Sequence, residues 1–328
     1  MVVEENFMPK IAYIEKRFIG KSLALINKIN SVITDYEAQG YKLTLRQVYY
    51  QMVARNIIEN NLKSYNNLGN LINDARLMGL IDWNSIEDRT RNLQCNLHFE
   101  NPQERLDMSA RNYMRDHWEG QSNYCEVWVE KDALIGVVGR ICQQLDVPYF
   151  SCRGYTSQSE MWVASQRLID RQEYGQYVSI FHLGDHDPSG KDMSRDIVDR
   201  LMRFEVSDSF FEFKRLALNY DQVEAYKPPP NPAKMTDTRF ENYVAEFGEE
   251  CWELDALEPK IISNLIANNV LPLRNETVYE SVLKKEAHEI KRLQALAQHY
   301  GSLDKNWKKV IETIEPKKKK QEKKHGKA

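Results

Sequence analysis

The chain has 328 residues, of which 42% are hydrophobic and 28% charged, and a formal net charge of −3. This composition is typical of a globular protein with two domains, or three small ones. No stretch approaches about eighteen apolar residues, and the N-terminus lacks a basic segment followed by an apolar one, so we expect neither a transmembrane helix nor a signal peptide.

The charge is unevenly distributed along the chain. Residues 317–328 hold seven lysines and one glutamate, about +6, so that the net charge of −3 leaves about −9 for the remainder. We expect residues 316–328 to be a disordered basic tail, which either contacts phosphate groups or only keeps the protein in solution. The five cysteines show no CxxC spacing, so we expect reduced, mostly buried thiols and no zinc site.

The N-terminal third is expected to consist of helices followed by short extended pieces. Apolar residues recur there every three or four positions. The expected helices span residues 9–40, 44–56 and 65–78, and the extended or turn segments span residues 80–83 and 86–89. Thr44 and Gln47 have the spacing of a capping box at the start of the second helix. After a helical segment over residues 1–40, this pattern predicts a winged helix-turn-helix domain over residues 41–115.

From about residue 124 strands and helices alternate. The expected strands span residues 125–129, 147–152, 177–183, 211–218 and 252–257, and the expected helices between the first four span residues 133–145, 159–172 and 191–204. Such alternation predicts a mixed α/β fold with a parallel, Rossmann-like sheet over residues 120–260, followed by helices over residues 261–315.

Three carboxylates follow two of the expected strands. Glu130 follows the first, and Asp185 and Asp187 follow the third, at the sheet edge where α/β proteins bind ligands. Carboxylates this close repel one another unless a cation is present, and oxygen ligands suit Mg²⁺, with Mn²⁺ as an alternative. Magnesium beside nucleic acid usually serves phosphodiester chemistry. The competing interpretation is a solvated turn, and His186 is expected to point away from the two aspartates.

A tyrosine pair lies on the second expected helix. Arg46 and Tyr50 are four residues apart and therefore share a face. A phenol with a pKa of about 10 is a poor nucleophile at neutral pH, but a guanidinium and a metal would stabilise the phenolate and the charge on a phosphate. Tyr49 is the neighbouring alternative. Both tyrosines also suit a buried core in which the hydroxyls are hydrogen bonded.

The segment Leu43-Thr-Leu-Arg-Gln-Val-Tyr-Tyr50, together with Glu130 and Asp185-His-Asp187, resembles the A subunit of type IIB DNA topoisomerases (topoisomerase VI) and their meiotic double-strand-break relatives. That family joins a winged-helix domain with a catalytic tyrosine to a Toprim domain that binds Mg²⁺. The resemblance implies that Tyr50 is the nucleophile beside Arg46. It also implies that Glu130, Asp185 and Asp187 hold the metal. In the transesterification that we expect, Glu130 is in addition a candidate for a proton transfer.

Several polar residues are candidates for further roles. We expect contacts to DNA from Asn70, Asn73, Arg76, Arg89, Arg91, Lys234 and Arg239, although an ordinary solvated surface explains them equally well. Glu253 and Asp255 either join the metal site or are structural. Arg153 and Gly154, after the second strand, are candidates for shaping a phosphate site.

These patterns predict a cytoplasmic, nucleoid-associated enzyme that cleaves double-stranded DNA with Mg²⁺. The resemblance implies a 5′-phosphotyrosyl link and a homodimer in which Tyr50 of one protomer meets the metal site of the other. No ATP-binding segment is present, so strand passage would need a separate ATPase subunit. Two alternatives stay open: a hydrolytic Toprim nuclease without a covalent intermediate, and a DNA-binding module that cleaves nothing.

Overall fold

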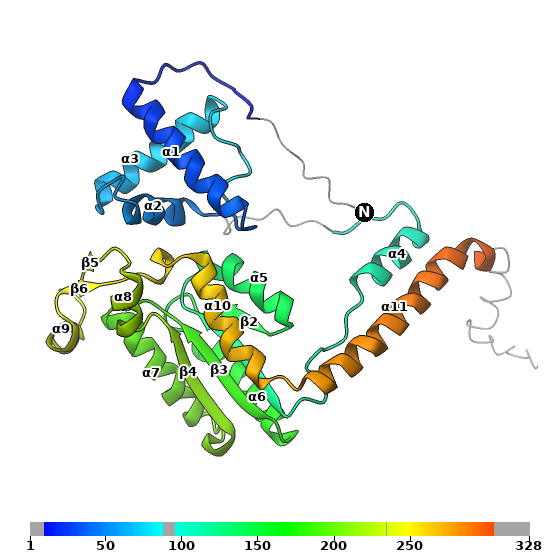
Figure 1. The fold of residues 1–328 in the computed structure, drawn as a ribbon. Coiled ribbons are helices and arrows are strands. Elements are labelled where there is room, and N and C mark those ends of the chain that lie inside the picture. Colours follow the sequence, from blue (N-terminus) through cyan, green and yellow to red (C-terminus); the bar gives the residue numbers. More distant parts are fainter. Residues whose placement is uncertain (1–9, 88–95, 234, 305–328) are drawn as a thin grey trace, which may run out of the picture. The chain divides into compact units, whose positions relative to one another are not determined.

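The computed structural model describes residues 10–87, 96–233 and 235–304 and divides into two compact units (Figure 1). The first unit comprises Met1–Leu93 and Gly120–Asn275, and the second comprises Gln94–Glu119 and Glu276–Ala328. The expectation of a mixed α/β fold is confirmed, because helices surround a four-stranded parallel sheet. The winged-helix and Toprim assignments and the expected domain boundaries stay predictions, and the basic tail over 316–328 lies outside the described residues.

Three helices form the N-terminal part of the first unit: α1 (Gly20–Glu37), α2 (Leu45–Ala54) and α3 (Leu62–Leu77). They share one apolar core, whose buried members include Ile29, Val48, Met52, Leu68 and Ile72. Within residues 10–87, extended pairing is limited to isolated bridges, Ala12 with Met78 and Leu43 with Ile86.

The predicted ends of these helices are corrected by local hydrogen bonds. Helix α1 begins at Gly20 rather than residue 9, since the backbone N–H of Tyr13 donates to Leu77 O on α3 instead of closing a helical turn. Helix α3 begins three residues early because the Asn61 side chain accepts from Ser64 N at 2.8 Å. The capping box of α2 is confirmed: Thr44 and Gln47 each accept the other's backbone N–H.

The central sheet has the strand order β2-β1-β3-β4, with all neighbours parallel. Its strands are β1 (Asn123–Val129), β2 (Tyr149–Ser151), β3 (Tyr177–Leu183) and β4 (Phe211–Ala217). The register pairs Val129 with Leu183, so β1 and β3 end at the same level. Residues that follow these two strands therefore meet at one edge of the sheet.

Helices cover both faces of this sheet (Figure 1). The helices are α5 (Ile135–Leu145), α6 (Gln158–Glu173), α7 (Pro188–Arg203) and α10 (Pro259–Val270). Alternation along β1 sends Trp128 into the core shared with α6 and α7. Cys125 points to the opposite face, where it approaches Cys142 of α5.

The segment after β4 departs most from expectation. Residues 252–257 were expected as a strand, but β5 (Asn231–Pro232) pairs antiparallel with β6 (Glu250–Cys251), and a 3-10 helix, η3 (Leu254–Ala256), follows. The chain turns here because Leu254 N donates to Asp185 Oδ1 at 2.8 Å. Helices α8 (Tyr220–Tyr226) and α9 (Phe240–Phe247), with the 3-10 turns η1 (Asp132–Leu134), η2 (Asp208–Phe210) and η4 (Leu271–Leu273), complete this unit.

The second unit packs helix α4 (Pro102–Asn112) against α11 (Glu276–Asp304). Arg115 Nη1 pairs with Glu289 Oε1 at 2.9 Å, and His117 Nε2 lies 2.8 Å from Glu286 Oε2. Helix was expected beyond residue 261 and is found as α10 and α11 as far as the structure describes the chain. Among the described helices, none is long and apolar enough to cross a membrane.

Candidate active site

Glu130 and Asp185 lie side by side at the carboxyl ends of β1 and β3. Glu130 N donates to Leu183 O at 2.8 Å, which continues the strand pairing by one residue. Asp185 N then donates to Glu130 Oε2 at 2.8 Å, and both side chains are buried. The close approach depends on Gly184, where a Cβ atom would lie 2.9 Å from Glu130 Oε2.

Asp187 has a structural task at this corner. Its Oδ1 accepts from Gly190 N at 2.6 Å, which makes Asp187 the N-cap of α7. The helix begins directly after it, at Pro188, a favoured residue for the first helical position.

Lys131, which sequence reasoning did not single out, lies among the acidic side chains. Its Nζ is 2.7 Å from Asp185 Oδ2, 2.8 Å from Glu253 Oε2 and 3.2 Å from Asp255 Oδ1. The turn at η3 brings the last two carboxylates to the strand ends. The signal in the sequence was a basic residue directly after the strand-end glutamate, and the ammonium now supplies positive charge to three carboxylates.

Burial and mutual repulsion disturb the ionisation of these carboxyl groups. Burial, with the negative charges of Asp185 and Asp187, raises the pKa of Glu130 to about 7. Burial raises the pKa of Asp185 despite Lys131, and raises that of Asp255 to about 6. Burial acts on Glu253 in the same direction, but Lys131 and Arg46 outweigh it and lower its pKa to about 2. Burial and mutual repulsion therefore favour the protonated forms of Glu130, Asp185 and Asp255, although Lys131 and Arg46 lie among these carboxyl groups.

The carboxylates have the ligand type that a divalent cation needs, but they are not arranged as a preformed metal site. Within the three described ranges, no three His, Cys, Asp or Glu side chains are grouped as a ready metal site. Glu130, Asp185 and Asp187 carry hard oxygen ligands of the kind that Mg²⁺ prefers. A cation beside Glu130 would lower its raised pKa, because positive charge favours the ionised carboxylate. Because Asp185 contacts Lys131, a bound cation would compete with that ammonium.

Helix α2 brings Arg46 to the same carboxylates. Arg46 Nε lies 3.0 Å from Asp255 Oδ2, and Nη2 pairs with Glu253 Oε2. The guanidinium carbon is 5.9 Å from the centre of the Tyr50 ring, so the shared helix face expected for Arg46 and Tyr50 is found. One ion-pair network therefore runs from the helix of Tyr50 to the strand end at Asp185.

Tyr49 and Tyr50 have different hydrogen-bond partners. The Tyr49 hydroxyl donates to Asn60 Oδ1 at 2.9 Å, whereas the Tyr50 hydroxyl lies 3.2 Å from Asn231 Nδ2. Burial and the charge of Glu253 raise the pKa of Tyr50 above its ordinary value. Both tyrosines line a hollow of about 240 Å³, whose other walls are Arg46, Asn60, Asn61, Leu62, Tyr65 and Asn231.

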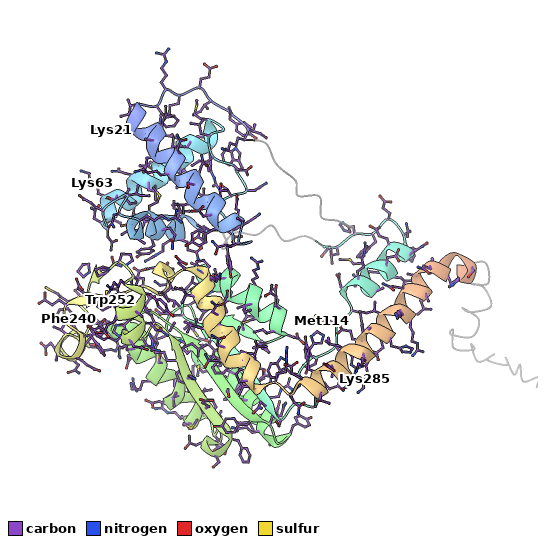
Figure 2. All side chains as sticks on the ribbon, in the orientation of Figure 1. Lys21, Lys63, Met114, Phe240, Trp252 and Lys285 are labelled. Atoms are coloured by element: carbon purple, nitrogen blue, oxygen red, sulfur yellow. The ribbon has the colours of Figure 1, made fainter. Side chains whose placement is uncertain are left out.

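His186 points away from the two aspartates, as expected. Its Nδ1 lies 2.8 Å from the Tyr243 hydroxyl, within a group of rings that includes Phe247 and Trp252, the latter labelled in Figure 2. Burial lowers its pKa to about 4. Arg215, which the sequence did not indicate either, donates to the carbonyls of Gly184 and Gly190. These bonds fix the backbone of the loop that carries Asp185 and Asp187.

The residues expected at a DNA interface differ in whether their polar groups are already bonded within the protein. Asn70 and Asn73 are exposed on α3. Arg76 donates to Trp83 O at 2.9 Å and to Ile86 O, and Arg239 pairs with Asp192 at 2.9 Å, so both guanidinium groups are occupied. Arg89, Arg91 and Lys234 lie outside the described residues.

The loop after β2 shows how Arg153 and Gly154 are placed. Both have positive φ values, 53° and 83°, and Gly154 N donates to Glu130 O at 3.3 Å. Arg153 is exposed and pairs with Asp132 at 3.2 Å. The two residues therefore adjoin Glu130 through the backbone, while the guanidinium points to η1.

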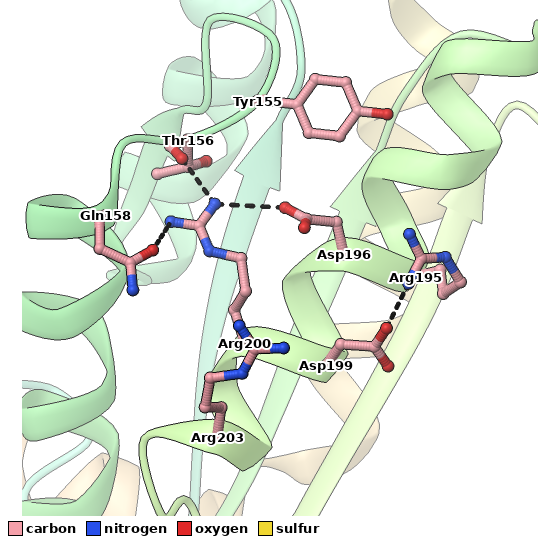
Figure 3. A pocket seen from close by; sticks show the side chains of 8 residues that line it. All are labelled: Tyr155, Thr156, Gln158, Arg195, Asp196, Asp199, Arg200 and Arg203. Carbon is pink, nitrogen blue, oxygen red and sulfur yellow. Dashed lines mark hydrogen bonds and ion pairs between the residues drawn. The ribbon is translucent and has the colours of Figure 1, made fainter. Parts of the chain in front are cut away.

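A larger hollow of about 590 Å³ lies beside α6 and α7 (Figure 3). Arg195 pairs there with Asp199. Arg200 pairs with Asp196 at 3.2 Å and donates to Thr156 O and Gln158 Oε1. The carboxylates of Asp196 and Asp199 offset two of the three arginines that line the hollow, so it does not have the character of a strong anion site.

Comparison of the chain with protein-family models, with curated proteins and with solved structures finds no match.

Proposed function

We propose that this protein cleaves DNA by transesterification, as an A-subunit-like member of the type IIB topoisomerase group with a winged-helix region and a Toprim domain. One observation carries the proposal. Arg46, one turn before Tyr50, shares Glu253 and Asp255 with Lys131, which contacts Asp185. A tyrosine hydroxyl and strand-end carboxylates therefore belong to one polar network. A nucleophile and the groups that stabilise a phosphate have to be close together in this way.

The proposed step exchanges one phosphate ester for another. The Tyr50 phenolic oxygen attacks a DNA phosphorus, the new O–P bond forms, and the bond to the 3′ oxygen breaks. The proton leaves Tyr50, and the departing 3′ oxygen gains one. Without a bound cation the pKa of Glu130 is about 7, which suits a proton transfer near neutral pH, and a cation on the same carboxylate would lower it. Arg46 would stabilise the charge on the phosphate and on Tyr50.

Glu130, Asp185 and Asp187 would hold Mg²⁺, or Mn²⁺, which would neutralise the negative charge on the phosphate. The proposal includes a homodimer on double-stranded DNA, a separate ATPase subunit for strand passage and a nucleoid location. The resemblance implies that Tyr50 acts at the partner's metal site. The contacts of Arg46 lie within one chain, so such an exchange would replace them with equivalent contacts across the dimer.

The test uses supercoiled plasmid with Mg²⁺ or Mn²⁺, quenched with denaturant and resolved with and without protease. Wild type is compared with Tyr50→Phe, and Tyr49→Phe is the matched control on the neighbouring residue. Cleaved DNA that carries protein in wild type and Tyr49→Phe, but not in Tyr50→Phe, is the expected result. Free ends from all three proteins would overturn the covalent mechanism.

Hydrolytic cleavage is the second candidate, and the burial of Tyr50 favours it. The side chain is only 4% exposed and its pKa is raised, both of which hinder nucleophilic attack. In that case water attacks the phosphate, Tyr50 is structural, and Asp185→Ala loses cleavage while Tyr50→Phe keeps it. A DNA-binding module without cleavage activity would instead bind in a salt-sensitive manner and leave the plasmid intact in every arm.

A further inference from the structure

We infer that Asn231 is an additional catalytic residue, whose side-chain amide donates a hydrogen bond to the phenolic oxygen of Tyr50. The inference rests on the proposed function, in which that oxygen is the attacking atom. Asn231 Nδ2 lies 3.2 Å from the hydroxyl oxygen and 3.4 Å from Glu253 Oε1. Asn231 is the first residue of β5 and lies in a proline-rich stretch of the chain.

The orientation of the Asn231 amide follows from its neighbours. The carbonyl oxygen of Pro230 can only accept, so the donor end of Asn60 faces it, and Asn60 Nδ2 also donates to Asn231 Oδ1 at 3.0 Å. Since the oxygen of Asn231 is thereby occupied as an acceptor, its NH₂ group must face Tyr50 and Glu253. Two successive amides thus carry one orientation from the Pro230 carbonyl to Tyr50.

The backbone holds this amide in place. Asn231 pairs with Cys251 in the short antiparallel ladder, which sets Glu253 two residues beyond the pairing. Pro230 and Pro232 flank Asn231 and restrict its backbone. Asn60 Nδ2 also donates to Pro230 O, which fastens the loop to the chain segment between α2 and α3. An amide fixed in this way needs little rearrangement before it can act.

The chemical consequence is selective support for the ionised tyrosine. A donor hydrogen bond strengthens when its acceptor becomes an anion. For Tyr50, burial and Glu253 raise the pKa, while the hydrogen bond from Asn231 lowers it. Glu253 also lies near the Tyr50 hydroxyl, since each group shifts the pKa of the other. The phenolic oxygen accepts from Asn231, and a donor on that oxygen supports the negative charge that it develops as it loses its proton.

The test compares wild type with Asn231→Leu, which removes the donor, and with Asn231→Asp, which keeps an acceptor for Asn60 but presents no NH₂ group. Asn268→Leu on the exposed side of α10 is the matched control. The first readout is the rate of phosphotyrosyl adduct formation at saturating DNA, beside DNA affinity from fluorescence anisotropy. The second is the fluorine NMR titration of 3-fluorotyrosine placed at position 50, without DNA or metal.

Both Asn231 variants should form adduct about ten- to a hundred-fold more slowly, the range for one hydrogen bond to a charged group, with DNA affinity unchanged. The pKa of the fluorotyrosine should rise in both, and the control should match wild type in both readouts. Unchanged rate and titration in the Asn231 variants would overturn the inference. If wild type itself forms no adduct, the proposed function fails, and an unchanged titration would then still refute the contact between Asn231 and Tyr50.

Discussion

The Nζ atom of Lys131 lies 2.7 Å from Oδ2 of Asp185, directly beside the strand end that carries Glu130. The same ammonium also contacts Glu253 and Asp255, so Lys131 binds three carboxylates at once. Such a residue stabilises the folded chain without a metal and competes with any divalent cation for Asp185. Substitution of Lys131 therefore tests both its contribution to stability and its competition with a metal.

Lys131→Met should destabilise the fold by about 3 kcal/mol, since it leaves the buried carboxylate of Asp185 without its paired cation, while Glu253 and Asp255 keep Arg46. Mg²⁺ should then raise the melting temperature of the variant by more than it raises that of wild type, because the competing ammonium is gone. Thermal melts with and without Mg²⁺ measure both effects. Lys21→Met, on the exposed start of α1, is the control. Equal Mg²⁺ shifts in variant and wild type would show that no cation replaces Lys131.

Glu130→Gln should change the pH dependence of stability. The pKa of Glu130 rises from an ordinary 4.5 to about 7, so the folded chain binds the proton more tightly than the unfolded chain does. This group therefore favours folding below pH 4.5, and the contribution is lost as the pH rises through 7. Without metal, the variant should be more stable than wild type at pH 8 by about 1–3 kcal/mol, and by much less at pH 5. Urea unfolding at both pH values measures the difference, and an equal difference at both would refute the assignment.

Arg167→Met should destabilise the sheet core. Arg167 Nε and Nη2 donate to Glu126 at 2.6 and 2.9 Å, and Glu126 on β1 is almost fully buried, with further donors from Tyr124 and Trp128. The variant should lose about 3 kcal/mol of unfolding free energy in urea titrations, because a charged carboxylate stays buried without its partner. The double variant Glu126→Gln with Arg167→Met should recover part of that loss. A double variant no more stable than the single one would contradict this account.

The sheet was predictable because periodicity and burial agree. Strand β3 was expected at residues 177–183 and is found there, since a short, mostly apolar run between turn residues has few alternatives. The meeting of Glu130 with Asp185 follows from parallel strands that end at one level. What failed was the segment 252–257, where Trp252 and Leu254 read as strand residues but turn around His186 and Asp185 through long-range bonds.

The hydrogen bonds and ion pairs of the site could not be predicted from local sequence patterns, because they join residues that are far apart in the sequence. The chain segments that carry Lys131, Asn231 and Arg215 are adjacent only after folding, and the sequence around Asn231 suggests no more than a proline-rich loop. Glu253 and Asp255 were noticed as carboxylates. Their attachment to Arg46 depends on the packing of α2 against η3, which no periodicity encodes.

Gly190→Ala should damage the acidic corner although alanine favours helices. A Cβ atom at Gly190 would overlap the Asp185 carbonyl oxygen and lie 3.0 Å from Glu130 Oε2. We expect a loss of about 1–3 kcal/mol of stability from this overpacking, together with a loss of cleavage. Gly20→Ala is the control: nothing lies within 4 Å of its Cβ position, so this variant should be neutral or slightly stabilised. Thermal melts of both variants decide the matter, and equal melting temperatures would contradict the predicted overlap.

Arg46 and Asp255 should be coupled in the adduct assay. If Asp255, which is 1% exposed, acts by orienting Arg46 toward Tyr50, then Arg46→Gln and Asp255→Asn remove the same contribution. Each single variant should slow adduct formation by about ten- to a hundred-fold, and the double variant should be little slower than either single one. A double-mutant cycle at saturating DNA measures this coupling, and melting curves identify variants that fail to fold. Multiplicative losses in the double variant would instead mean that Asp255 acts through Lys131 and the strand end, independently of the tyrosine helix.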